Sequence, residues 1–124
     1  MSLPPLTFAA PVLRVADLKR SLAYYTGPLG FSLEFEYEGC YASVMRDGCH
    51  IHLKAAEPPP RDQAAFEAAE HIDICLGVKD ATGLANELAD TGATISLKLR
   101  EMPYGKELYV RDPDGYVLGF IEAT

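Results

Sequence analysis

Apolar positions recur along the chain at two different spacings, and each spacing predicts one kind of element. A mostly apolar run over residues 8–15 indicates a buried strand. Leu18, Leu22 and Tyr25 then recur at helical spacing, which predicts a helix directly after it. Over residues 31–38 apolar side chains alternate with Ser and Glu, which predicts a half-buried strand whose glutamates share the polar face.

The predicted elements follow the same order in both halves of the chain. In the first half we expect strands at residues 8–15, 31–38, 41–46 and 49–55, and a helix at 18–26. In the second half we expect strands at 71–78, 94–100, 106–111 and 116–122, and a helix between Asp80 and Gly92. Landmarks correspond at offsets of 62 to 67 residues: Asp17 with Asp80, Gly30 with Gly92, and Gly48 with Gly115. The chain is therefore interpreted as an internal duplication of a β-α-β-β-β module.

The two modules are assigned to residues 7–55 and 71–122, joined by a connector over 56–70. Three consecutive prolines begin at Pro58, and an Ala-rich stretch after them predicts a short helix over 63–70. With 124 residues, 48% of them apolar, the chain has the size and composition of one domain over residues 1–124. Folding at this size buries about two-thirds of the surface. A single module is too small for that, so we expect the copies to pack together or to exchange with a second chain.

Charge and targeting signals narrow the function classes. The chain has 11 Lys and Arg against 18 Asp and Glu, a net charge of −7, and no basic cluster that would bind nucleic acid. No apolar run approaches the roughly 18 residues of a membrane-spanning helix, and no signal peptide is visible. The three cysteines are odd in number and lack metal-motif spacing. We expect a cytoplasmic protein that does not contact membranes.

Short motifs in this framework resemble those of one known family. Val15-Ala16-Asp17-Leu18 opens the first predicted helix, and Leu29-Gly30-Phe31 follows it. Near the end, Met102-Pro103-Tyr104-Gly105 is followed by Asp112-Pro113-Asp114-Gly115-Tyr116. In this order they resemble the vicinal oxygen chelate superfamily of glyoxalases, extradiol dioxygenases and bleomycin-resistance proteins, and most closely its bleomycin-resistance branch. The resemblance implies an α+β fold in which duplicated modules form a curved mixed sheet around a cleft, with the helices on the outer face.

The resemblance also implies where a metal would bind. Enzymes of the family hold a divalent metal with side chains from the first and last strands of each module, and these positions here are Ala10, His52, Asp73 and Gly119. Ala10 and Gly119 have no ligand side chain, whereas catalytic divalent sites generally use at least three protein ligands. We therefore expect no complete catalytic metal site and no cofactor, with His52 and Asp73 as the ligands if a divalent metal binds. The small residues are expected to widen the cleft.

A shifted metal site remains an alternative. Strand parity places His50 and His52 on one face of their strand, and His71 and Asp73 on one face of theirs, opposite Ile72. If both faces line one cleft, these four side chains offer a ligand set suited to Zn, Fe, Ni or Mn. The other interpretation is that they are polar cleft walls with ordinary hydrogen bonds.

Acidic and aromatic residues suggest the kind of ligand. Glu34, Glu36 and Glu38 form a negative row, which either attracts a cationic ligand or is a solvated face. Tyrosines are candidates for stacking on a flat ligand, and Tyr104 in its glycine-containing loop is the first choice over Tyr41, Tyr109 and Tyr116. The candidate cleft residues are His50, His52, His71, Asp73, Tyr104 and Gly119.

The function implied by the resemblance is sequestration of a small organic, cationic ligand in a dimer cleft, with no catalytic residues. One alternative is a metal-dependent glyoxalase-like lyase or dioxygenase that uses His52, Asp73 and either His50 or His71; Gly119 in place of the usual glutamate argues against the glyoxalase reaction. Another is a binding module for an intracellular metabolite. Pro11 matches a proline that in bleomycin-resistance relatives accompanies exchange of the N-terminal strand, so we expect a homodimer, either exchanged or with a simple bend at Pro11.

Overall fold

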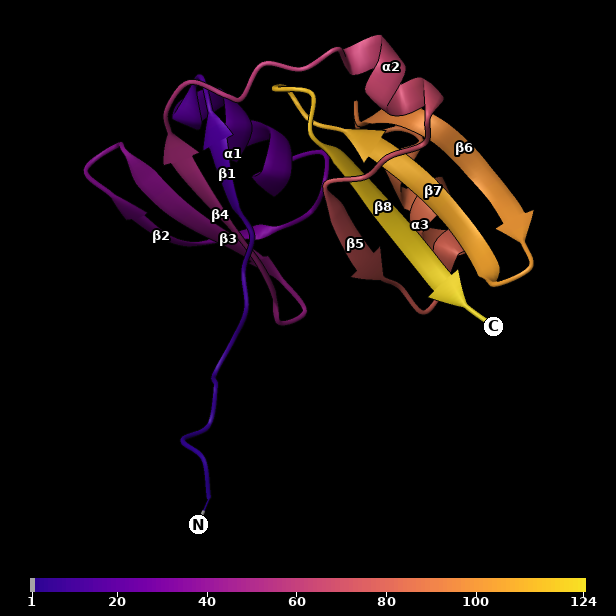
Figure 1. Ribbon diagram of the computed structural model, residues 1–124, viewed down its shortest axis with the longest axis horizontal. Helices are drawn as coiled ribbons and strands as arrows, with labels where there is room; N and C mark the ends of the chain where they lie inside the picture. The colour runs from indigo at the N-terminus through magenta and orange to yellow at the C-terminus, as the bar shows by residue number, and fades with distance from the viewer. Residues whose placement is uncertain (1) are drawn as a thin grey trace.

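The computed structural model describes residues 2–124 and has the predicted α+β architecture (Figure 1). The first module contains β1 (Val12–Val15), α1 (Leu18–Thr26), β2 (Ser32–Tyr37), β3 (Tyr41–Arg46) and β4 (Cys49–Ala55). The connector contains α2 (Gln63–Ala68). The second module contains β5 (Ile74–Gly77), α3 (Ala81–Leu88), β6 (Thr94–Met102), β7 (Gly105–Arg111) and β8 (Val117–Ala123). Within residues 2–124 no helix has the length and apolar character needed to cross a membrane.

Each module forms its own four-stranded mixed sheet. Sheet A has the strand order β1-β4-β3-β2 and sheet B the equivalent order β5-β8-β7-β6. In both sheets the first strand pairs in parallel with the last, and the other neighbours are antiparallel. The helix after each first strand packs on one face of its sheet, α1 on sheet A and α3 on sheet B. Each helix therefore covers one face of its own sheet, and the segments that lie against the opposite face differ between the two modules.

The hydrophobic core lies between the sheets and these helices. Leu13 and Val15 of β1 and Ile51 and Leu53 of β4 alternate along their strands and are buried on the α1 side. In sheet B the equivalent buried side chains are Leu108, Val110, Leu118 and Phe120, and they belong to the same core cluster. Full burial of each such side chain contributes about 1.5–3 kcal/mol. A core shared by both modules explains why neither module has to fold alone.

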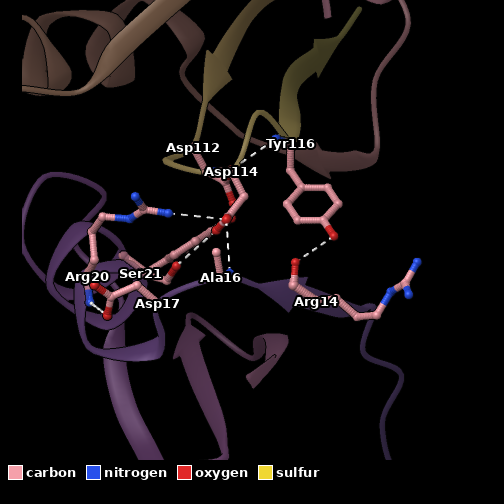
Figure 2. A network of polar contacts seen from close by, with 9 residues as sticks. Arg14, Ala16, Asp17, Arg20, Ser21, Asp112, Asp114 and Tyr116 are labelled. Carbon is pink, nitrogen blue, oxygen red and sulfur yellow. Dashed lines mark hydrogen bonds and ion pairs between the residues drawn. The ribbon is translucent and has the colours of Figure 1, made fainter. Parts of the chain in front are cut away.

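The turn between β7 and β8 fastens the second module to α1 (Figure 2). Asp114 in this turn accepts hydrogen bonds from Ala16 N at 3.1 Å, Arg20 Nη2 at 3.2 Å and Ser21 Oγ at 3.3 Å. Its side chain is only 2% exposed. The motif Asp112-Pro113-Asp114-Gly115 therefore joins the two modules rather than contributing to a ligand site.

Asp112 forms the second half of this junction. Its carboxylate accepts hydrogen bonds from the Tyr25 hydroxyl at 2.8 Å and from the backbone N–H of Asp114 and Tyr116 at 2.8 and 2.9 Å. Burial raises the pKa of Asp112 to about 6, against the hydrogen bonds that favour its charged form. The Tyr116 hydroxyl donates to the Arg14 carbonyl at 2.8 Å, so Tyr116 packs between the modules and is not available for stacking on a ligand (Figure 2).

The predicted first strand is too long at its N-terminal end. Pairing begins only where His52 N donates to the Pro11 carbonyl at 2.9 Å, and β1 starts at Val12. Residues 2–10 form an arm that leaves the body of the chain (Figure 1). Leu3 and Leu6 in this arm are 88% and 97% exposed. Apolar composition alone predicted a strand here, but none of the described strands forms a hydrogen-bonded ladder with residues 2–10.

The predicted alternation along β2 is also wrong, because the strand contains a bulge. Leu33 pairs with Val44 of β3, but Phe35 pairs with Ser43, so the register shifts by one residue between them. Leu33 therefore points to the α1 side while Phe35 points to the opposite face. Glu34, the extra residue, shares that opposite face with Phe35. A single inserted position thus changes which side chains face each way, which strict alternation cannot foresee.

Candidate functional site

The face of sheet A turned away from α1 is the strongest candidate for a binding site. We call it the aromatic face. It is formed by alternate residues of β2, β3 and β4, together with Phe8 from the arm, and its members are Phe8, Glu34, Phe35, Tyr37, Tyr41, Ser43, His50 and His52. Phe8, Phe35 and Tyr37 are 59%, 42% and 60% exposed. Large apolar side chains gathered on an exposed face are typical of an interaction or binding surface.

The aromatic rings on this face lie in mutual contact. Phe35 and Tyr41 are stacked with an interplanar angle of 10° and ring centroids 6.3 Å apart. His52 meets both edge-on, at 5.8 Å from Phe35 and 5.4 Å from Tyr41. Phe8 lies over the two histidines, 5.2 Å from His50 and 5.8 Å from His52. Flat rings held in this way offer both stacking and edge contacts to a planar ligand.

His52 has one ring nitrogen without a partner. Its Nδ1 lies 2.8 Å from the Tyr41 hydroxyl, which fixes the orientation of the ring. Its Nε2 is buried and has no hydrogen-bond partner among the described residues. Buried polar atoms are normally paired, so a ligand or a partner chain is the expected source of the missing contact.

Glu34 places a carboxylate at the edge of these rings. It accepts a hydrogen bond from the Ser43 hydroxyl at 2.7 Å and lies 3.2 Å from His50 Nδ1. The Ser43 hydrogen bond, with a smaller contribution from His50, lowers the pKa of Glu34, so it is ionised at neutral pH. The predicted row of three glutamates is wrong: Glu36 pairs with Ala42 on the α1 side, and Glu38 lies in the turn after β2.

The corresponding face of sheet B is covered by the connector. Asp73 is held by Arg61 through two contacts of 2.6 and 2.8 Å and also accepts a hydrogen bond from Val117 N at 2.8 Å. His71 is exposed and packs against the ring of Phe66 in the connector, with centroids 5.3 Å apart. Neither side chain is directed to the aromatic face.

The four candidate metal ligands therefore do not form one site within the chain. His50 and His52 belong to sheet A, while His71 and Asp73 precede β5 of sheet B. In residues 2–124 no group of three or more His, Cys, Asp and Glu side chains is arranged to hold a metal ion. The positions used by the family do not fit a metal either, since Ala10 and Gly119 offer no donor and Asp73 is already paired with Arg61.

The expectation that Gly119 widens a cleft is wrong. A Cβ at this position would come within 3.0–3.1 Å of the Ile72 side chain and 3.3 Å of Tyr109. Ile72 therefore covers the connector side of sheet B. Strand parity does not apply to residues 71–73, because β5 begins only at Ile74. The space beside the glycine is filled by the chain itself.

Tyr104 lies in the turn between β6 and β7 and is 47% exposed. Its hydroxyl donates to Glu107 Oε1 at 2.6 Å, and this bond raises the pKa of Tyr104. Tyr104 thus belongs to sheet B with Tyr109, whereas Tyr41 is the candidate tyrosine that the structure places on the aromatic face. Sequence reasoning missed Phe8 and Phe35, because one lies in the arm and the other follows the bulge.

The sequence model of the Glyoxalase/Bleomycin resistance protein/Dioxygenase superfamily matches residues 7–120. The chain belongs to this superfamily. This confirms the resemblance inferred from the motifs. A curated relative, the lactoylglutathione lyase of Salmonella typhimurium, is 26% identical over 133 aligned positions that cover 90% of this chain and 89% of that protein.

Solved structures of two ligand-binding proteins share the fold. A bleomycin-binding protein from Streptomyces verticillus, complexed with copper(II)-bleomycin, has a TM-score of 0.75 at 24% identity and covers 98% of this chain and 100% of its own. TnmS3, an antibiotic-binding protein from Streptomyces sp. CB03234, has a TM-score of 0.75 at 18% identity and covers 99% of this chain and 100% of its own. At these identities the likeness establishes the fold and leaves the ligand to the chemistry of this chain.

Proposed function

We propose that this protein binds a small, planar, cationic organic molecule on the aromatic face and sequesters it without breaking a bond. The observation that carries the proposal is Glu34, an ionised carboxylate beside Phe35, Tyr41 and His52. A cation over an aromatic ring gains about 0.5–2 kcal/mol, and a nearby carboxylate adds a charge-assisted hydrogen bond. The net charge of −7 favours the approach of a cation over that of an anion.

The ligand set of the chain supports binding rather than metal-dependent chemistry. Two of the four family positions, Ala10 and Gly119, have no donor atom, and the Arg61 guanidinium already neutralises Asp73. The bleomycin-binding and antibiotic-binding proteins with the same fold support the proposal, because in them this architecture binds small organic molecules.

A metal-dependent lyase is the second candidate. It is favoured by the similarity to a lactoylglutathione lyase and by the unpartnered Nε2 of His52, which is one of the four family positions. Metal content per chain, measured by elemental analysis after exposure to Ni, Mn, Zn or Fe(II), separates the two functions. Stoichiometric metal that is lost in His52→Ala would contradict sequestration without a metal.

We propose that the protein acts as a homodimer. Leu3, Leu6 and Phe8 in the arm and Phe35 and Tyr37 on the aromatic face are all exposed in a single chain. A second copy that receives the arm and lies over the aromatic face buries these side chains and encloses the ligand. Analytical ultracentrifugation of the full chain and of a variant lacking residues 2–9 tests this, with a monomeric full chain as the contradicting result.

The binding test uses two glutamates of the same strand. Glu34 faces the rings and Glu36 faces the α1 side, so both substitutions to Gln remove one charge from β2. Isothermal titration with bleomycin and with the planar cation thioflavin T is expected to show saturable binding that weakens about tenfold in Glu34→Gln and stays unchanged in Glu36→Gln. Equal affinities of the two variants, or no saturable binding of either probe, would overturn the proposal.

A further inference from the structure

The connector is attached to sheet B mainly through charged side chains. None of the residues of α2 is buried. On one side of α2 stand three consecutive prolines, and on the other Glu70 adopts a positive φ of 58°. A short helix with no buried side chain contributes little hydrophobic stabilisation, so polar contacts must hold it in place.

Two of these contacts involve arginines of the sheet. Arg111 of β7 donates from Nε to Glu67 Oε2 at 2.6 Å and also pairs through Nη2 with the other carboxylate oxygen. Arg100 of β6 donates to both oxygens of Glu70, at 2.9 and 2.7 Å. In each case the guanidinium meets the carboxylate with two parallel bonds, the geometry that also recognises the carboxylates of ligands.

The arginines differ in what else holds them. Arg100 also pairs with Glu107, a carboxylate only 1% exposed, at 2.8 Å from Nε and 2.6 Å from Nη2, so its position does not depend on Glu70. Arg111 forms its carboxylate pair with Glu67 alone among the described residues. Sheet B thus presents Arg100, which Glu107 holds from beneath, and Arg111, whose one anionic partner within residues 2–124 is Glu67 of the connector.

We propose that Arg100 and Arg111 form a binding subsite for a small molecule with two carboxylate groups, and that Glu67 and Glu70 occupy it in this structure. The connector acts as a tethered competitor: a free dicarboxylate must displace carboxylates held at high effective concentration. This subsite lies on sheet B and is independent of the aromatic face, so the two proposals stand or fall separately.

The test measures succinate binding by isothermal titration at low salt. The wild type is expected to bind weakly, and Glu67→Gln/Glu70→Gln at least tenfold more tightly, because both guanidinium groups lose their tethered partners. Acetate, with one carboxylate, is expected to gain less. The matched control is Glu36→Gln/Glu101→Gln, which removes two negative charges without touching the connector.

One further variant, with two measurements of folding, keeps the proposal falsifiable. Arg111→Lys in the Glu67→Gln/Glu70→Gln background retains the charge but loses the two parallel bonds, and it is expected to abolish most of the gain. Circular dichroism and the melting temperature report whether each variant is folded. An equal gain in the two double variants would show a general charge effect, and no gain in either would show that the arginines do not receive a ligand; each result overturns the subsite. Binding of thioflavin T is expected to be unaffected throughout.

Discussion

Sheet A and sheet B have the same strand order, yet the faces turned away from their helices differ in exposure. The aromatic face of sheet A is open, while the equivalent face of sheet B lies beneath the connector, with Ile72 over Gly119. The difference arises from the segment that enters the first strand of each module. The arm before β1 leaves the body, whereas the connector before β5 folds back over its own sheet (Figure 1). The duplicated modules supply two equivalent scaffolds, and the preceding segment decides which one remains available.

The largest effect is expected where the two modules are joined. Asp114→Ala removes the acceptor for Ala16 N, Arg20 and the buried Ser21 hydroxyl, and the free energy of unfolding should fall by about 3 kcal/mol. Urea unfolding followed by circular dichroism measures this. Asp90→Ala, at an exposed position, is the control and should change stability by less than about 0.5 kcal/mol. Similar losses in both variants would show that the junction does not couple the modules.

The difference between the two faces is tested directly at one small residue beside each face. Gly119→Ala forces a methyl group against Ile72, so we expect a loss of about 1–3 kcal/mol from overpacking. Ala10→Val adds a larger side chain beside the open face and should change stability by less than about 0.5 kcal/mol. Thermal unfolding of both variants measures these two changes in stability. If Ile72→Ala does not relieve the loss in Gly119→Ala, the Ile72 side chain is not the source of the crowding.

The pH dependence of stability should reveal the buried junction. Because burial raises the pKa of Asp112 from 3.8 to about 6, the folded chain binds more protons than the unfolded chain in this range. The contribution of Asp112 is therefore fully present below its unfolded pKa and is lost as the pH rises through about 6, with a slope of at most about 1.4 kcal/mol per pH unit. Asp112→Asn should remove this slope in urea titrations between pH 4 and pH 7. An unchanged slope would assign it to another group.

The connector should show the opposite pH dependence. Its pairing with Arg111 lowers the pKa of Glu67 from 4.5 to about 2, so its contribution is present above 4.5 and is lost as the pH falls toward 2. Hydrogen exchange of residues 62–70, followed by mass spectrometry and compared with the intrinsic exchange rate at each pH, should show protection that is lost over this range in the wild type. In Glu67→Gln this loss should be absent because the connector is already unprotected at neutral pH.

The smallest effect on stability is expected on the aromatic face. Phe35 is 42% exposed, so Phe35→Ala should cost the isolated chain less than about 1 kcal/mol. The same variant should weaken binding of thioflavin T at least fivefold, since the ring stacks with Tyr41. A large loss of stability with unchanged binding would mean that the ring supports the fold and does not contact a ligand.

Much of the fold could be predicted because local signals determine it. Asp17 and Asp80 were expected to begin helices, and their side chains accept hydrogen bonds from Arg20 N and Gly83 N at 3.1 and 2.9 Å. The repeated order of elements was expected from landmarks in the two halves, and the family follows from the same residues. These features depend on a few neighbouring positions, and the sequence records them directly.

The candidate site was less predictable, because it depends on strand register and on ion pairs between distant residues. His50 and His52 lie on one face, as strand parity requires, but the bulge in β2 brings Glu34 and Phe35 to that face and removes Glu36 from it. Asp73 was expected beside them, and its partner is Arg61 of the connector. No short-range pattern specifies a shift in register or an ion pair between a loop and a strand.

By itself, the sequence determined the duplicated modules, the helix starts, the shared apolar core and membership in the superfamily, because caps and periodic burial act over a few residues. Only the tertiary structure decided which sheet face stays open. That outcome depends on where the arm and the connector run after the core has formed, and their paths are set by contacts between residues far apart in the chain, such as Glu67 with Arg111 and Ile72 with Gly119.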